Sequence, residues 1–140
     1  MKKTPYLAAI QVEPRDPIEL LSGFHSRLSA TYRCADVDAW YETGAEFLVQ
    51  GSDGHRVEIV LAELFESKLG NCFVMISNRR SWMAWLRNRE SPLIKEIVLK
   101  ARDWFLSLGL ERELWWSEKS FPDFSSEQGW TKTPVLDEPG

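Results

Sequence analysis

DVDAWYETGAEFLVQGSDGHRVEIVLAEL, residues 36–64, carries a clear strand pattern on both sides of a turn. After the turn sequence GSDG, the apolar residues Val57, Ile59 and Leu61 alternate with charged residues, which is the pattern of a strand with one buried face. Asp-Gly suits the left-handed backbone of a tight hairpin turn, so the segments before and after it are expected to pair. The stretch therefore predicts a meander of antiparallel strands.

Three segments outside this meander also have the composition of strands. YLAAIQVEP at 6–14 reads as a strand that Pro14 closes, and CFVMIS at 72–77 is a short apolar run typical of a central strand. LERELWWSEK at 110–119 is expected to form the last strand. We therefore expect a sheet of about five strands.

A first helix is expected at residues 17–29. Asp16 can cap this helix, because Pro17 occupies the first helical position and Glu19 follows three residues after the cap. The residues expected on its buried face are Ile18, Leu21, Phe24, His25 and Leu28.

The clearest helix follows Ser91 and Pro92, which can cap and start it, and Gly109 is placed to end it. Its expected buried stripe consists of Ile94, Ile97, Ala101, Trp104, Phe105 and Leu108. A short helix is also expected at 82–89. The order of these elements predicts an α+β fold, in which an antiparallel sheet carries the two main helices on one face.

Length and composition fit one globular domain. The chain has 140 residues, of which 44% are hydrophobic and 27% are charged, so it can bury a core. We expect a single domain over residues 1–124 and an irregular tail over 125–140, which is polar and contains Gly and Pro. Because we find no signal-peptide pattern and no membrane-spanning run, we expect a cytoplasmic protein with reduced thiols.

Charge is distributed unevenly along a chain whose formal net charge is −4. Residues 79–102 are basic, whereas residues 36–66 contain only one arginine, Arg56. The acids of that second stretch are Asp36, Asp38, Glu42, Glu46, Asp53, Glu58, Glu63 and Glu66. The meander and the last strand are therefore expected to present an acidic surface, which favours a basic protein partner.

The sequence carries no catalytic or metal-binding signature. Cys34, Cys72, His25 and His55 are scattered along the chain, whereas zinc ligands come in closely spaced pairs. We therefore expect no enzyme, no cofactor and no metal site. The alternative is a small-ligand-binding protein or enzyme with an aromatic-lined pocket between the sheet and the helices. The polar group of such a pocket would be Asp36, Asp38, His25 or His55.

Trp115 and Trp116 are adjacent in ERELWWSEKSFPDF, residues 111–124, and in a strand they point to opposite faces. Trp116 shares its parity with Leu114 and is expected to point inward, beneath the long helix. Trp115 then points outward, where either the aromatic residues of the tail cover it or a partner uses it as an anchor. Those aromatic residues are Phe121, Phe124 and Trp130. The residues expected to bind the partner are Trp115, Glu113, Glu111, Glu58, Glu46 and Glu42.

RRSWMAWLRNR at 79–89 supports a different alternative, an RNA or DNA binder. Arginine and tryptophan side chains together can grip a phosphate backbone and stack on bases. The arginines concerned are Arg79, Arg80, Arg87 and Arg89. An amphipathic helix with inward tryptophans explains the same pattern, and the rest of the chain supplies few positive charges. We therefore expect no nucleic-acid partner.

In size, acidity, tryptophan content and lack of catalytic residues, the chain resembles the cognate immunity proteins with which bacteria block their toxins. The resemblance rests on size and composition and covers no motif. It implies an inhibitor that covers the active site of a toxin. The leading hypothesis is a non-enzymatic protein-binding module that docks a basic partner, such as a cognate toxin, through its acidic sheet face. A secretion or assembly chaperone is close to this hypothesis.

Overall fold

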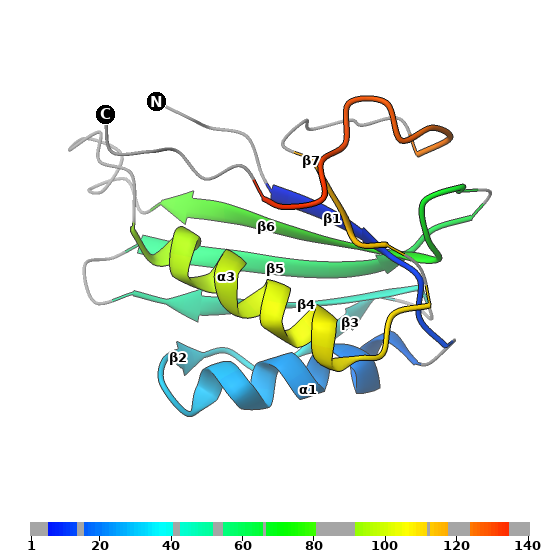
Figure 1. Cartoon of the computed structure of the whole chain (residues 1–140). Coiled ribbons are helices and arrows are strands. Elements are labelled where there is room, and N and C mark those ends of the chain that lie inside the picture. Colours follow the sequence, from blue (N-terminus) through cyan, green and yellow to red (C-terminus); the bar gives the residue numbers. More distant parts are fainter. Residues whose placement is uncertain are drawn as a thin grey trace, which may run out of the picture.

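The computed structural model shows one antiparallel sheet and, in the described part of the chain, two helices (Figure 1). The described residues are 6–13, 16–40, 43–51, 55–65, 67–80, 92–111, 113–117 and 124–134. The α+β class predicted from the sequence is confirmed. The helix predicted at 82–89 lies outside the described residues. So does the GSDG turn, apart from Gly51.

In the described part of the chain the sheet has seven strands, and all neighbours pair antiparallel. They are β1 (Tyr6–Ile10), β2 (Arg33–Cys34), β3 (Asp38–Trp40), β4 (Gly44–Gln50), β5 (His55–Glu63), β6 (Cys72–Arg80) and β7 (Trp115–Ser117). Their order is β2-β4-β5-β6-β1-β7, and β3 also pairs with β4. The expected five strands become seven because β2 and β3, of two and three residues, are too short to show a visible alternation.

Both described helices, α1 (Pro17–Ser29) and α3 (Pro92–Ser107), lie on the same face of the sheet (Figure 1). α1 begins as predicted, because the Asp16 carboxylate accepts a hydrogen bond from the Ile18 N–H at 2.9 Å. α3 ends just before Gly109, whose φ of 70° lies in the left-handed region that glycine adopts without strain. The other face of the sheet is called the opposite face below.

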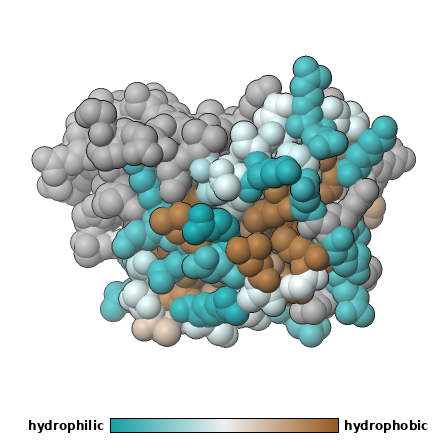
Figure 2. Space-filling view, viewed as in Figure 1, coloured by the Kyte–Doolittle hydropathy of each residue, from teal (hydrophilic) through white to brown (hydrophobic). Residues whose placement is uncertain are grey.

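The prediction that Ile18 is buried is wrong, since Ile18 is 41% exposed. The buried stripe of α1 centres on Phe24, and at 3.6 residues per turn Ile18 lies about 120° away from it around the helix. Leu20 is buried instead. Figure 2 shows that hydrophobic patches on the helix-bearing face are interrupted by hydrophilic side chains. Single exposed apolar residues of this kind, among them Leu99 and Leu106 of α3, are normal for a protein surface.

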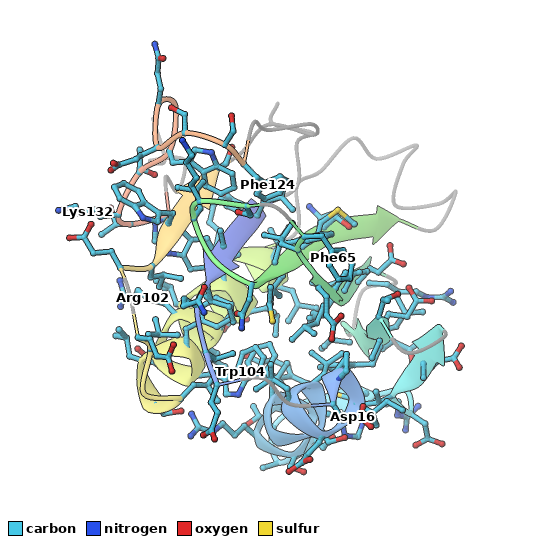
Figure 3. All side chains as sticks on the ribbon, turned by 90° about the vertical axis from the view of Figure 1, so that its right-hand side faces the viewer. Asp16, Phe65, Arg102, Trp104, Phe124 and Lys132 are labelled. Atoms are coloured by element: carbon cyan, nitrogen blue, oxygen red, sulfur yellow. The ribbon has the colours of Figure 1, made fainter. Side chains whose placement is uncertain are left out.

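The main core lies between the sheet and the two helices. Trp104 of α3 stacks on Phe24 of α1, with 4.7 Å between ring centroids and 9° between ring planes. Phe105 contacts Trp116 of β7 at 5.7 Å between centroids. Figure 3 shows Trp104 in the space between the two helices. The predicted stripe of α3 is therefore buried where it faces the sheet and α1.

β1 is a buried strand next to the last strand, β7. β6 and β7 both pair antiparallel with β1, so they run parallel to each other, with β1 between them and α3 as their connection. All five residues of β1 are buried. The register places Trp116 opposite Ala8 and Trp115 opposite Ala9. β7 is shorter than the strand predicted at 110–119.

The turn before β6 extends the sheet beyond the last residue of β1. The Asn71 N–H donates to the Ile10 carbonyl at 2.9 Å. The Asn71 side chain donates to the Val12 carbonyl at 2.7 Å and accepts from the Val12 N–H at 3.1 Å. Gly70 approaches the same chain so closely that a Cβ atom there would lie 2.5 Å from the carbonyl carbon of Ile10. A glycine is therefore required at position 70.

Residues 124–134, called the C-terminal segment below, return to the sheet beside β7. Trp116 and Thr131 exchange two backbone hydrogen bonds, of 2.7 and 2.9 Å. Trp130 is 7% exposed and joins Ala9 and Leu69 in a second, smaller core on the opposite face. The C-terminal segment therefore covers part of that face. No helix in the described ranges is long and apolar enough to cross a membrane.

Candidate functional site

Strand alternation places acidic side chains together on the opposite face of the sheet. Phe47 and Ile59 belong to the main core, so Glu46 and Glu58, their neighbours along β4 and β5, point away from the helices. Asp38 of β3 is directly opposite Glu46 in the strand register. Glu46 and Glu58 therefore lie on the opposite face with Asp38 beside them, and so does Arg56.

These side chains surround a surface hollow of about 210 Å³, called the acidic hollow below. The residues that line it are Ala35, Asp36, Asp38, Glu46, Phe47, Leu48 and Glu58. Four of these seven residues are carboxylates and none is basic. Arg56, two residues before Glu58 on the same face of β5, is the nearest basic residue along that strand. Carboxylates concentrated in this way create a local negative potential.

His25 of α1 supports the rim of the acidic hollow. Its Nε2 lies 2.9 Å from the Ala35 carbonyl oxygen, which can only accept, so Nε2 donates. The imidazole also packs edge-on against Phe47, with 5.0 Å between ring centroids. The Ala35 N–H in turn donates to the Leu48 carbonyl at 2.8 Å. These contacts fix the segment that brings Asp36 and Asp38 to the sheet.

The two adjacent tryptophans point to opposite faces, as predicted. Trp116 is 1% exposed and packs in the main core. Trp115 is half-buried on the opposite face, where it packs against the smaller core that Trp130 completes. Phe124 packs against the same core. The C-terminal segment therefore supports Trp115, and the use of Trp115 by a partner stays a prediction.

Trp115 also lines a larger hollow of about 790 Å³, called the Trp115 hollow below. The residues that line it are Ser67, Lys68, Leu69, Glu113, Trp115, Ser125, Ser126 and Glu127. The Phe124 carbonyl ties its two walls together, since it accepts from the Lys68 N–H at 3.1 Å and the Ser67 hydroxyl at 3.3 Å. Figure 3 shows Phe124 and Lys132 on the C-terminal segment, with Phe124 nearer the sheet.

The structure separates the residues predicted to bind a partner. Glu46 and Glu58 line the acidic hollow, whereas Glu113 and Trp115 line the Trp115 hollow. Glu111 is exposed, lines neither of these two hollows, and uses its backbone N–H to bind the Gln11 carbonyl at 2.9 Å. Glu42 lies outside the described residues.

No protein-family model matches the chain, and no curated protein or solved structure matches it either. The two hollows and the chemistry of their lining are therefore the features of the molecule that bear on its function.

The arginines of the nucleic-acid alternative are only partly described. Arg79 and Arg80 are the last two residues of β6, and Arg79 is opposite Arg56 in the register with β5. Arg87 and Arg89 lie outside the described residues. The nucleic-acid alternative stays a hypothesis.

The cysteines and histidines considered as metal ligands are not gathered into a site in the described ranges. There, no group of three or more His, Cys, Asp or Glu side chains is arranged to hold a metal ion. Both cysteines are free thiols. Burial raises the pKa of the Cys34 thiol, an effect that a hydrogen bond with Ser29 partly offsets.

Cys72 is more deeply placed than Cys34. Burial, together with the negative charge of Glu63, raises the pKa of the Cys72 thiol to about 11 from an ordinary value near 9. Glu63 is directly opposite Cys72 in the register of β5 and β6. A thiol with a raised pKa is a poor nucleophile at neutral pH, because the thiolate is the reactive form.

Cys72 should make the protein less stable as the pH rises from 9 to 11. In this window the unfolded chain loses the thiol proton while the folded chain keeps it, so the unfolded state binds fewer protons. The free energy of unfolding should fall by up to about 1.4 kcal/mol per pH unit from this group. Urea unfolding under reducing conditions should show a smaller loss for Cys72→Ala over the same window. An equal loss in both proteins would contradict the assignment.

Proposed function

We propose that the protein is a non-enzymatic binding module that docks a basic protein partner through the opposite face of its sheet. The acidic hollow is the observation that carries this proposal. Asp38 and Glu46 are directly opposite each other on paired strands, and Asp36 and Glu58 line the same hollow. Like charges in directly opposed positions weaken a sheet. A basic side chain of a partner placed between them is therefore favoured.

The overall charge supports the same kind of partner. A formal net charge of −4, together with the carboxylates of the acidic hollow, would accelerate the encounter with a basic protein and disfavour acidic ones. The most concrete form of the proposal is an immunity- or antitoxin-like inhibitor that covers the working surface of a cognate toxin. A secretion or assembly chaperone would use the same surface chemistry.

An affinity capture with charge-matched variants tests the proposal. The bait is the tagged full chain, exposed to a lysate of its own organism at low salt and at about 1 M salt, where the Debye length is about 3 Å. We expect one dominant basic protein at low salt. It should be lost at high salt and with the double variant Asp38→Asn, Glu46→Gln.

The matched control is Glu96→Gln with Asp103→Asn, two exposed acids of α3 on the helix-bearing face. It removes the same two negative charges and should capture the basic protein as the wild type does. Trp115→Ala serves as a further bait at the other end of the opposite face. Equal capture by the Asp38/Glu46 variant and the control, or no basic protein with any bait, would rule out docking through the acidic hollow.

A further inference from the structure

We infer that the Trp115 hollow is a pocket for an arginine side chain of the basic partner. This inference rests on the proposed function and adds a second contact to it, at a different place on the opposite face. It concerns a different set of residues from the acidic hollow, since the two linings have no residue in common.

Trp115 supplies a rigid aromatic surface in this pocket. One side of its side chain packs against the smaller core of Ala9, Leu69 and Trp130, while the residue also lines the hollow. The backbone bridge between Trp116 and Thr131 fixes the strand that carries it. Tryptophan is the best aromatic partner for a cation above its ring, and a ring that is already immobile loses little entropy on binding.

Glu113 and Glu127 supply the negative charge of the pocket from two separate segments. Lys68 is the only basic residue among the described residues of the lining, and a second ammonium group, that of Lys132, reaches Glu113 from the C-terminal segment. Glu113 already binds a cation, because Lys132 Nζ lies 3.1 Å from its Oε1. Both of these side chains are more than half exposed, and such surface pairs contribute little stability. A partner's cation can therefore replace Lys132 at small cost.

The lining favours arginine over lysine as the entering side chain. A guanidinium is planar, so it can stack on the indole of Trp115 while its five N–H donors reach acceptors around the ring edge. Those acceptors are the carboxylates of Glu113 and Glu127 and the hydroxyls of Ser125 and Ser126. A lysine ammonium is compact and strongly hydrated and gains less from a flat surface. The volume of about 790 Å³ leaves room for part of the segment that carries the arginine.

A peptide titration followed by nuclear magnetic resonance tests the inference without the partner. The indole N–H signal of Trp115 in the ¹⁵N-labelled full chain is assigned by its disappearance in Trp115→Phe. The probes are acetyl-Gly-Arg-Gly-amide and the neutral acetyl-Gly-Gln-Gly-amide. We expect the arginine peptide to shift the Trp115 signal saturably and the glutamine peptide to leave it in place.

Two exposed-acid variants complete the test. Glu113→Gln with Glu127→Gln should weaken arginine-peptide binding about tenfold, because two charge-assisted hydrogen bonds are lost. Glu96→Gln with Asp103→Asn removes the same charge outside the hollow and should bind as the wild type does. An unmoved Trp115 signal, an equal shift with the glutamine peptide, or equal weakening in both variants would overturn the inference.

The outcome is separable from that of the proposed function. If the partner is captured through Asp38 and Glu46 but the arginine peptide fails at Trp115, docking stands and the arginine pocket does not. If the peptide binds at Trp115 while capture is insensitive to Asp38 and Glu46, the acidic hollow is not the docking surface.

Discussion

Trp104→Ala is expected to lower the free energy of unfolding by about 4 kcal/mol, the range found when large aromatic side chains are removed from a core. Trp104 is buried, stacks on Phe24 and contacts Phe105 at 5.0 Å between ring centroids. Its stack on Phe24 joins α3 to α1, so its loss leaves a cavity between both helices and the sheet. Domains have total stabilities of about 5–15 kcal/mol, so this variant should lie near the limit of folding.

Chemical denaturation measures the effect, with Leu106→Ala as the control on the same helix. Leu106 is 64% exposed, so its truncation should change stability by no more than about 0.5 kcal/mol. The denaturation midpoint of Trp104→Ala should fall far below those of the wild type and the control. Similar midpoints for the two variants would show that the helices are not held through Trp104.

Gly70→Ala is expected to destabilise the protein by about 3 kcal/mol, although it adds a single methyl group. The added Cβ would overlap the backbone carbonyl of Ile10, and backbone atoms of a buried strand cannot move aside as a flexible side chain can. Relief of the overlap would pull the turn away from β1 and strain the hydrogen bonds between Asn71 and Val12. The variant should therefore lose both stability and close packing at the end of β1.

Gly23→Ala is the matched control, because it makes the same chemical change at a glycine of α1. A Cβ there would lie 3.8 Å from Trp104 Nε1, an ordinary contact. Alanine is favoured over glycine in a helix by about 1 kcal/mol, so this variant should be as stable as the wild type or more so. Thermal unfolding of both variants measures the difference in stability. Equal changes in unfolding temperature would mean that the turn at Gly70 can shift.

The helices could be predicted closely because their signals are local. Asp16 and Pro17 mark the start of α1, and Gly109 marks the end of α3, through backbone chemistry that neighbouring residues supply. Ile18 is exposed, and His25 and Leu108 are only half-buried, because all three lie at the edges of their buried stripes. Residues at a stripe edge are buried or exposed according to what packs beside them, which the sequence of the helix does not contain.

The hollows could not be predicted in the same way, because each combines segments that are distant in the chain. Strand parity correctly placed Trp115 and Trp116 on opposite faces, and it correctly placed Glu58 away from the buried Val57 and Ile59. No pattern along the chain indicates that Glu127 and Lys68 lie around Trp115. Their position depends on the path of the C-terminal segment, which is held by the buried Trp130, the β-bridge at Thr131 and the hydrogen bonds to the Phe124 carbonyl. Such tertiary contacts have no periodicity to detect.

The pairing of Trp116 with Thr131 also bears on how copies of this chain meet one another. An unpaired outer strand is a template on which a second molecule can add its own strand, and this is a common route to aggregation. In this fold, the outer backbone groups of Trp116 are already bonded within the chain. At the other side of the sheet, β2 and β3 are very short, and β3 carries Asp38. Growth of the sheet from one molecule into the next is therefore disfavoured at both of its sides.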